Sequence, residues 1–208
     1  MKFVTIADSH GQHHRLILPK GDVIIHAGDV SRRGEENEVI DFLNWFSTLD
    51  YQHKIFIAGN HDFYFERTSG EEIKKIIPNN VTYLCDSGTT IENVKIWGSP
   101  VTPWFFDWAF NRRRGEPIAR HWDLIPSDTD ILITHGPAFC KLDKTKDGKN
   151  VGCKDLLDKV RELKPKFHVC GHIHEAYGQL SHSMTRFINA SVLDENYVLK
   201  NAPLTFDV

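Results

Sequence analysis

Short apolar runs recur along the chain, and each of them stops at a small group of polar residues. The runs are rich in Val, Ile and Phe, and they cover residues 3–7, 23–27, 55–58, 131–134 and 167–170. Runs of this length, bounded by turn-forming residues, are typical of buried strands. Ligands of α/β sheets bind beyond the carboxyl ends of the strands, so the polar groups that follow the runs are candidates for chemistry.

Segments with helical periodicity lie between these predicted strands. The clearest predicted helix covers residues 35–50, where apolar residues are spaced three and four apart. We expect shorter helices at residues 71–77 and 153–163, and hairpin-like segments around 81–98 and 177–200. The alternation of strands and helices, with hairpins added, predicts an α/β (α+β) fold with a mixed sheet or two packed sheets, covered by helices.

The composition is typical of a folded protein. The chain has 208 residues, of which 40% are apolar and 25% are charged, and this excludes disordered, collagen-like and coiled-coil classes. No repeat, low-complexity tract or linker divides the sequence, so we expect one domain over residues 1–208. The formal net charge of −3 provides no global basic field to gather long nucleic acids.

Targeting features and cysteine usage indicate the compartment. The amino-terminal apolar stretch is too short for a signal peptide, and no run approaches the roughly 20 apolar residues of a membrane helix. The four cysteines (Cys85, Cys140, Cys153 and Cys170) include no C-x-x-C pair, so reduced thiols are favoured over disulfides or a structural zinc site. We therefore expect a cytoplasmic protein with no membrane partner.

The polar residues at the five strand ends form one set with metal-binding chemistry. They are Asp8, His10, Asp29, Asn60, His61, His135, His172 and His174. A single Asp or His at such a place is more often a turn, a cap or a hydrogen-bonded structural residue, but five coincidences favour a site. Carboxylate, imidazole and amide oxygen without thiolate suit Mn, Fe, Zn or similar ions. So many ligands predict two ions, which can clamp both the attacking and leaving oxygens at phosphorus.

The blocks that contain these residues resemble those of the calcineurin-like metallophosphoesterases. They read Asp8-x-His10, Gly28-Asp29-(x)4-Gly34, Gly59-Asn60-His61-Asp62, His135-Gly136 and Gly171-His172-x-His174. Further motifs between residues 96 and 191 are similar to the small metallophosphodiesterase branch, which includes brain-expressed metallophosphoesterase-domain proteins and their bacterial relatives. The resemblance implies a four-layer sandwich of two mixed β-sheets flanked by helices.

The resemblance also implies how the metal ligands are divided. Asp29 would bridge two ions. The other ligands of the first ion would be Asp8, His10 and His174. Those of the second ion would be Asn60, His135 and His172. The same ligands accept Mn, Fe, Zn, Co or Ni, with Mn the first choice in vitro.

Two further residues are candidates for catalysis. A metal-bridging hydroxide would attack phosphorus in line, and His61 would protonate the leaving group or stabilise charge on the phosphoryl oxygens. Asp62 would orient the His61 imidazole, with the alternative that it caps the following segment. Four other histidines need no catalytic role: His13 and His14 on a surface turn or helix start, and His26 and His168 in the core.

Residues 97–114 combine aromatic side chains with three arginines. Such a segment could stack a nucleobase and bind phosphate oxygens, or its aromatic rings could fill a gap between the sheets. Asn111 and Arg112 are the candidate substrate contacts. The lysine-rich stretch 141–149 also carries Asp residues, and a solvated loop is the favoured interpretation.

We therefore predict a dinuclear metal-dependent phosphodiesterase that hydrolyses small phosphodiesters, with cyclic nucleotides first among them. The alternatives are a phosphomonoesterase or a nuclease on the same site, or a non-catalytic scaffold that binds metal or nucleotide. The sequence leaves open the native metals, the natural substrate and whether the protein is a monomer or a small homo-oligomer.

Overall fold

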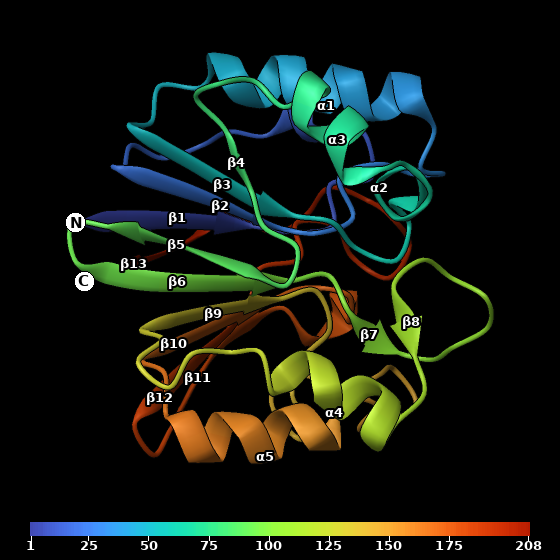
Figure 1. Ribbon diagram of the computed structural model, residues 1–208, viewed down its shortest axis with the longest axis vertical. Helices are drawn as coiled ribbons and strands as arrows, with labels where there is room; N and C mark the ends of the chain where they lie inside the picture. The colour runs from blue at the N-terminus through green and yellow to red at the C-terminus, as the bar shows by residue number, and fades with distance from the viewer.

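Two mixed β-sheets lie face to face in the computed structural model, which describes residues 1–208 (Figure 1). In order across the first sheet, the strands are β13 (Leu204–Asp207), β1 (Lys2–Ile6), β2 (Val23–Ala27), β3 (His53–Ile57) and β4 (Thr82–Tyr83). In order across the second sheet, they are β11 (Gly178–His182), β12 (Thr185–Asn189), β10 (Phe167–Cys170), β9 (Ile131–Thr134), β6 (Val94–Ser99) and β5 (Ser87–Ile91). A separate two-stranded sheet pairs β7 (Thr102–Pro103) with β8 (Asn111–Arg112).

Helices cover the outer faces of both large sheets and complete the four-layer sandwich (Figure 1). On the first sheet lie α1 (Glu36–Thr48) and α3 (Gly70–Ile76), with the short α2 (Phe63–Arg67) beside them. On the second sheet lie α4 (Glu116–Trp122) and α5 (Lys154–Leu163). Two 3-10 turns follow strands, η1 (His13–Arg15) and η2 (His174–Ala176). None of the helices is long and apolar enough to cross a membrane.

Parallel pairing sets the position of the site. Strands β1 to β4 pair in parallel, as do β6, β9, β10 and β12, while β13, β5 and β11 pair antiparallel at the edges. The parallel strands of both sheets point the same way in Figure 1, so their carboxyl ends meet at one edge. The chain termini lie at the opposite edge, where the Met1 amino group donates to the Val208 carbonyl at 2.8 Å.

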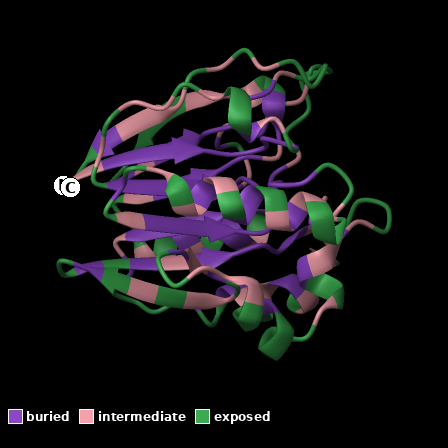
Figure 2. Ribbon diagram, turned by 90° about the horizontal axis from the view of Figure 1, so that it is seen from above, coloured by how far each residue is buried: buried purple, intermediate pink, exposed green.

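The main core is the apolar layer between the sheets. Buried side chains from both sheets meet there, including Ile25, Ile57, Ile133, Val169 and Ile188. Since helices cover the outer faces, the central strands are buried on both sides (Figure 2). This explains why those strands appear in the sequence as continuous apolar runs rather than as alternating patterns.

Helix α1 illustrates how local sequence and packing agree. The helix begins after Glu35, where the Glu35 and Glu38 side chains form a reciprocal capping box that satisfies the first backbone N–H groups. The four residues that define its predicted apolar face are all buried against the first sheet, namely Val39, Phe42, Leu43 and Phe46. The cap and the apolar stripe therefore both favour a helix in the same segment of the chain.

The predicted strands and helices are present, and two hairpins differ in extent. The hairpin expected around 81–98 is β5 and β6, whereas β4 joins the other sheet beside β3. The hairpin expected around 177–200 stops at Asn189, because the following chain crosses to the first sheet and pairs at Ala7 and Ser191. All four cysteines are free thiols, as predicted.

A glycine between the two sheets provides a test of this packing. A Cβ atom added to Gly98 in β6 would lie 2.6 Å from Leu84 Cβ and 2.7 Å from Ile57 Cγ2. We expect Gly98→Ala to lower the free energy of unfolding by about 1–3 kcal/mol, because overpacking forces the sheets apart. Urea denaturation measures this change.

The matched control is Gly70→Ala at the start of α3, where an added Cβ meets nothing within 4 Å. This variant should keep or slightly raise stability, because Ala favours a helix by up to about 1 kcal/mol over Gly. Equal stability of both variants would contradict the close approach of the sheets at Gly98.

Candidate metal centre

The sequence-predicted residues follow the carboxyl ends of five parallel strands. Asp8 follows β1, Asp29 follows β2, Asn60 follows β3, His135 follows β9 and His172 follows β10. Both sheets deliver these ends to the same edge of the sandwich (Figure 1). The fold therefore collects side chains that lie up to about 160 residues apart in sequence, as in the hydrogen bond from the His172 backbone to Asp8.

Sharp turns aim these side chains inwards. Asp8, His10, Asp29 and His172 have positive φ angles of 55°, 41°, 56° and 71°, which are uncommon for residues other than glycine. Backbone hydrogen bonds hold the turns, including Asp8 N to Gly28 O at 2.9 Å and His10 N to Asp29 O at 3.1 Å. Strain of this kind is characteristic of functional sites, where the surrounding structure maintains it.

The glycines of the motifs allow two carboxylates to approach the backbone. A Cβ atom on Gly59 would lie 2.3 Å from Asp29 Oδ1, and one on Gly171 would lie 2.2 Å from Asp8 Oδ2. No side chain fits at either position without displacing a carboxylate. The glycines at positions 59 and 171 are therefore steric requirements of the site.

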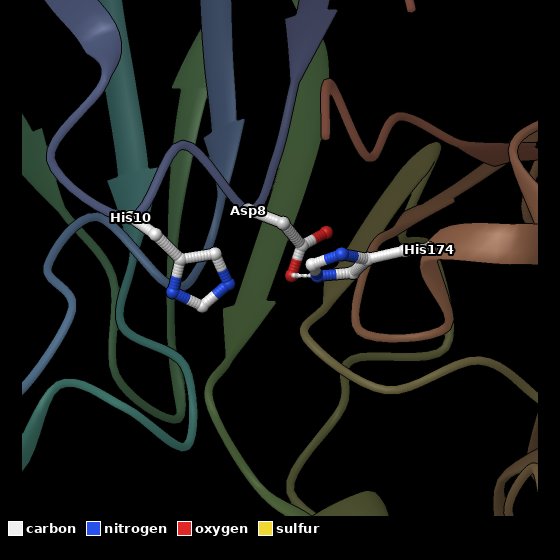
Figure 3. A group of neighbouring side chains, drawn as sticks. All are labelled: Asp8, His10 and His174. Carbon is white, nitrogen blue, oxygen red and sulfur yellow. Dashed lines mark ion pairs between the residues drawn. The ribbon is translucent and has the colours of Figure 1, made fainter. Parts of the chain in front are cut away.

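One group of candidate ligands comprises Asp8, His10 and His174, whose ligand atoms lie within 4.8 Å of one another. Figure 3 shows the Asp8 carboxylate facing the His174 imidazole, with the His10 ring directed towards them from the other side. His174 Nε2 lies 3.6 Å from Asp8 Oδ1. All three residues are buried.

A second group lies around His135. Its Nε2 atom is 2.9 Å from Asn60 Oδ1 and 3.3 Å from Asp29 Oδ2. The His172 ring is 5.0 Å from the His135 ring, centroid to centroid. The structure thus brings together the residues predicted for the second ion.

Asp29 lies between the two groups. The same oxygen, Oδ2, is 3.3 Å from His135 Nε2 and 3.6 Å from His10 Nε2. The other oxygen, Oδ1, accepts a hydrogen bond from the His61 backbone N–H at 2.8 Å. This arrangement allows Asp29 to bridge two ions.

Backbone carbonyls fix the orientation of the imidazoles. The Nδ1 atoms of His10, His135 and His174 lie 3.2, 3.0 and 2.9 Å from backbone carbonyl oxygens, those of Ser31, Ala27 and Asp194 respectively. Since a carbonyl only accepts, each Nδ1 carries a proton, and Nε2 is left to face the centre of the site. This is the usual support of a metal-binding histidine.

The donor set fits divalent ions. His10 Nε2 is buried and has no hydrogen-bond partner, although it faces the Asp29 carboxylate. A buried polar atom without a partner is costly, and a metal ion would satisfy it. Imidazole nitrogens, carboxylates and one amide oxygen, with no thiolate among them, suit Mn, Fe, Zn and related ions.

The electrostatics of the metal-free site are dominated by its two carboxylates. Burial disfavours the charged form of Asp8, but His174 outweighs this effect and holds the Asp8 pKa below its usual value. Burial likewise opposes ionisation of Asp29, and His135 lowers its pKa well below the usual value. In turn, Asp29 raises the pKa of His135 and Asp8 raises that of His174, both to about 9 despite burial.

His61 lies beside the metal ligands and keeps one nitrogen free. Its Nδ1 atom lies 2.8 Å from the Arg32 carbonyl oxygen, so Nδ1 carries a proton and Nε2 is available for proton transfer. The Trp108 ring stacks on the His61 imidazole at 4.4 Å, and the His10 ring meets it edge-on at 4.6 Å. These contacts hold the imidazole at the mouth of the site.

The structure corrects the role expected for Asp62. Its carboxylate accepts from the backbone N–H groups of Gly59, Val30 and Ser31 at 2.8, 3.1 and 2.9 Å, and from Ser31 Oγ at 2.5 Å. The carboxylate makes no hydrogen bond to the His61 imidazole, and although Asp62 occupies the N-cap position of α2, its side chain forms no capping hydrogen bond. Asp62 instead ties the loop after β2 to the loop after β3, which carry Asp29 and Asn60.

A cavity of about 440 Å³ extends from His172. Its walls include Trp104, Phe105, Arg114 and Asn150. Trp104 and Phe105 are 53% and 61% exposed, so these two rings do not fill a gap between the sheets. The cavity therefore joins the candidate metal centre to an aromatic and cationic surface.

The two predicted substrate contacts are not in the lining of this cavity. The Asn111 amide is used within the loop, where it donates to Thr102 Oγ1 and Ala109 O and accepts from Phe105 N. Arg112 lies 3.5 Å from the Glu66 carboxylate. Arg114, two residues further on, lines the cavity instead.

Two residues near the site, Ser191 and Tyr197, were not among the candidate site residues identified from the sequence. Ser191 Oγ lies 2.6 Å from Asp8 Oδ2 and 2.8 Å from Asn189 Oδ1, so its single proton can be donated to the Asp8 carboxylate and orient it. The Tyr197 ring lies 5.0 Å from the His10 ring and 5.2 Å from the His174 ring. Both follow β12, in the segment expected to be part of a hairpin.

Comparisons with known proteins agree with the motifs. A family model described as calcineurin-like phosphoesterase matches residues 1–176. Metallophosphoesterase domain-containing protein 1 of Homo sapiens is 39% identical over 231 residues, covering 100% of this chain and 71% of that protein. A UPF0046 protein of Caenorhabditis elegans is 37% identical, covering 99% of this chain and 74% of that protein.

Solved structures share the fold at low sequence identity. One superimposes with a TM-score of 0.63 at 15% identity, covering 90% of this chain and 89% of that chain. Another, described as GAP50, the anchor in the inner membrane complex of Plasmodium, gives a TM-score of 0.54 at 9% identity, covering 98% of this chain and 76% of that chain. These likenesses concern the fold alone.

Metal uptake at this site should release protons. His135 and His174 have pKa values of about 9 in the metal-free protein, so both are protonated at pH 7 and must lose a proton to bind a metal. We expect release of about two protons at pH 7 and about one at pH 9, with affinity for Mn²⁺ rising over this range. Calorimetric titration in buffers of different ionisation enthalpy counts the protons.

The control for the proton count is His174→Gln. This variant should release about one proton fewer at pH 7, because only His135 remains to be deprotonated. Heats that do not depend on the buffer would show that these imidazoles do not take up the metal.

Proposed function

This chain belongs to the calcineurin-like phosphoesterase family, and we propose that it is a dinuclear metal-dependent phosphodiesterase acting on small phosphodiesters, with cyclic nucleotides first among them. The observation that carries the proposal is the position of Asp29. Its Oδ2 atom faces both groups of candidate ligands at 3.3 and 3.6 Å, as a carboxylate shared by two ions requires.

The chain provides a full set of ligands for two ions. Bound there, the ions would lower the pKa of a water molecule and neutralise charge on the phosphoryl group. The protein residues orient this chemistry. Ser191 and the His172 backbone N–H hold the Asp8 carboxylate, and the Asp62 carboxylate keeps the loops of Asp29 and Asn60 in register.

His61 is suited to assist departure of the leaving group. As imidazolium, it can donate the proton on Nε2 to the departing oxygen, while Nδ1 stays bound to the Arg32 carbonyl. Its stack on Trp108 keeps the ring from turning away. Because Asp62 does not contact the ring, the orientation of His61 depends on Arg32 and Trp108.

The cavity beside His172 favours a diester over a monoester. A diester carries a second organic group, and a cavity of about 440 Å³ gives this group a place outside the reacting centre. Trp104 and Phe105 provide faces on which a base can stack. Arg114 donates to the Gly152 and Val151 carbonyls at 2.8 and 2.7 Å, so a fixed positive charge lies in the cavity wall.

Substrate preference tests the proposal. With metal-stripped protein reloaded with Mn²⁺, we expect kcat/KM to be higher for bis-p-nitrophenyl phosphate and 2′,3′-cyclic AMP than for p-nitrophenyl phosphate. His172→Gly should abolish turnover of both diesters, because it removes a ligand of the second ion. A preference for the monoester would indicate a phosphatase, and stoichiometric metal binding without turnover would indicate a scaffold.

A matched pair of aromatic variants tests separately whether the cavity binds a nucleobase. Trp104→Ala should lower kcat/KM for 2′,3′-cyclic AMP by about 5- to 150-fold, the range expected for loss of one base stack. Phe106→Ala is the control, because Phe106 is 65% exposed and does not line the cavity. Equal effects of the two variants would exclude base stacking on Trp104 while leaving the diesterase activity in place.

Leaving-group dependence tests the role of His61. His61→Ala should retain both metal ions and slow hydrolysis by about 10²- to 10⁴-fold for poor leaving groups such as an alkoxide. The loss should be smaller for p-nitrophenolate, which leaves without protonation. Metal analysis and kcat for a series of aryl and alkyl phosphodiesters measure both effects, and equal slowing across the series would exclude proton donation by His61.

A further inference from the structure

A second cluster of metal-binding side chains lies outside the candidate metal centre. It consists of His13 and His14 in η1 and Asp41 in α1, whose ligand atoms lie within 4.8 Å of one another. Both histidines were expected on a surface turn or helix start. The structure places them in η1, but only His14 is exposed, while His13 is fully buried.

The buried His13 ring has one charged neighbour, the Asp41 carboxylate. Neither of its ring nitrogens makes a hydrogen bond, and the ring packs against Trp45 and Phe42 at 4.9 and 5.6 Å. Nevertheless, Nε2 points to Asp41 and lies 3.1 Å from Oδ2. Burying an imidazole in which neither nitrogen completes a hydrogen bond is costly, and such groups in native proteins call for a water or an ion.

The distances in the cluster match those between ligands of one ion. His14 Nε2 lies 3.1 Å from Asp41 Oδ1, the same separation as that between His13 Nε2 and Asp41 Oδ2. Two ligands bound at about 2.0–2.2 Å in a tetrahedral zinc site are about 3.3–3.6 Å apart. The side chains therefore need little movement to share an ion.

We propose that His13, His14 and Asp41 bind one divalent transition-metal ion in a site separate from the candidate metal centre, with Zn²⁺ as the preferred ion. Two imidazoles and one carboxylate are a donor set that suits Zn²⁺. Solvent completes the coordination on the exposed side, where His14 and Asp41 are 56% and 55% exposed.

The environment of His13 also favours the form that binds metals. Burial lowers its pKa to about 4, so the imidazole is neutral at pH 7. The His13 imidazole can therefore bind an ion at pH 7 without first losing a proton from its charged form.

An ion in this site would connect η1 to α1. The η1 turn follows the loop that carries Asp8 and His10, and the Gln12 side chain on this loop donates to the Tyr197 carbonyl at 3.0 Å. Binding of Zn²⁺ would therefore stabilise the loop from a point outside the candidate metal centre. The site lies apart from the cavity at His172, because none of its ligands lines that cavity.

Zinc stoichiometry tests the proposal. Wild-type protein, His14→Ala and Asp41→Asn are equilibrated with Zn²⁺, dialysed and analysed for metal content, with His182→Ala as the control for loss of an exposed histidine. We expect one equivalent of Zn²⁺ fewer in His14→Ala and Asp41→Asn than in wild type and His182→Ala. Activity measured with Mn²⁺ should be unchanged in these variants, which separates this site from the proposed catalytic one.

Fluorescence of Trp45 provides a second readout. Its ring lies 4.9 Å from the His13 ring and 6.4 Å from the His14 ring, so Co²⁺ bound in the cluster should quench it. We expect one component of the Co²⁺ quenching to disappear in His14→Ala and in Trp45→Phe. Equal zinc content in all four proteins, together with quenching that does not change in His14→Ala, would overturn the proposal.

Discussion

Two buried carboxylates, Asp8 and Asp29, are the constraint on which the rest of the site depends. Removing such groups from water costs several kcal/mol each unless positive charge and hydrogen-bond donors surround them. Three features of the backbone bring such groups to the carboxylates. They are the positive-φ turns, the glycines without room for a Cβ, and the carbonyls that orient each imidazole through Nδ1. In the absence of metal, His135 and His174 carry the compensating charge. The same geometry that stabilises the carboxylates thus prepares them for divalent ions.

Most of the strands and helices could be predicted from local pattern, because buried strands and helices each require their own spacing of apolar residues. The pattern left one mixed sheet or two packed sheets open, and the structure confirms the four-layer sandwich that the family resemblance implied. The exceptions are segments whose structure is decided by distant partners. Thr82 and Tyr83 pair with β3 of the first sheet, although they precede a hairpin of the second. The chain after Asn189 crosses between the sheets, where Ala7 and Ser191 pair. The spacing of apolar residues does not predict such a bridge.

The candidate ligands could be found from sequence because each lies within a few residues of the end of a strand, where the direction of the side chain is set by the turn. The surrounding residues could not, because their roles depend on contacts across the fold. Asp62 is next to His61 in sequence, yet its donors include Val30 and Ser31 of another loop. Arg112 was the expected substrate contact, but Glu66 engages it and Arg114 reaches the cavity. The composition of residues 97–114 shows that this segment is cationic and aromatic, but it does not predict which side chain faces the site.

The histidines show why the environment of each ring, rather than its position along the chain, separates structural from functional residues. His26 and His168 are fully buried in strands, and each has one nitrogen near a hydroxyl, Ser9 Oγ at 2.9 Å and Thr134 Oγ1 at 2.7 Å. His10 and His13 are buried as well, but in both the Nε2 atom faces a carboxylate without forming a hydrogen bond. A hydroxyl can satisfy one nitrogen of an imidazole in a closed core, whereas a carboxylate beside Nε2 can share a bound ion with it. By this criterion His13 is grouped with the candidate ligands and not with the core.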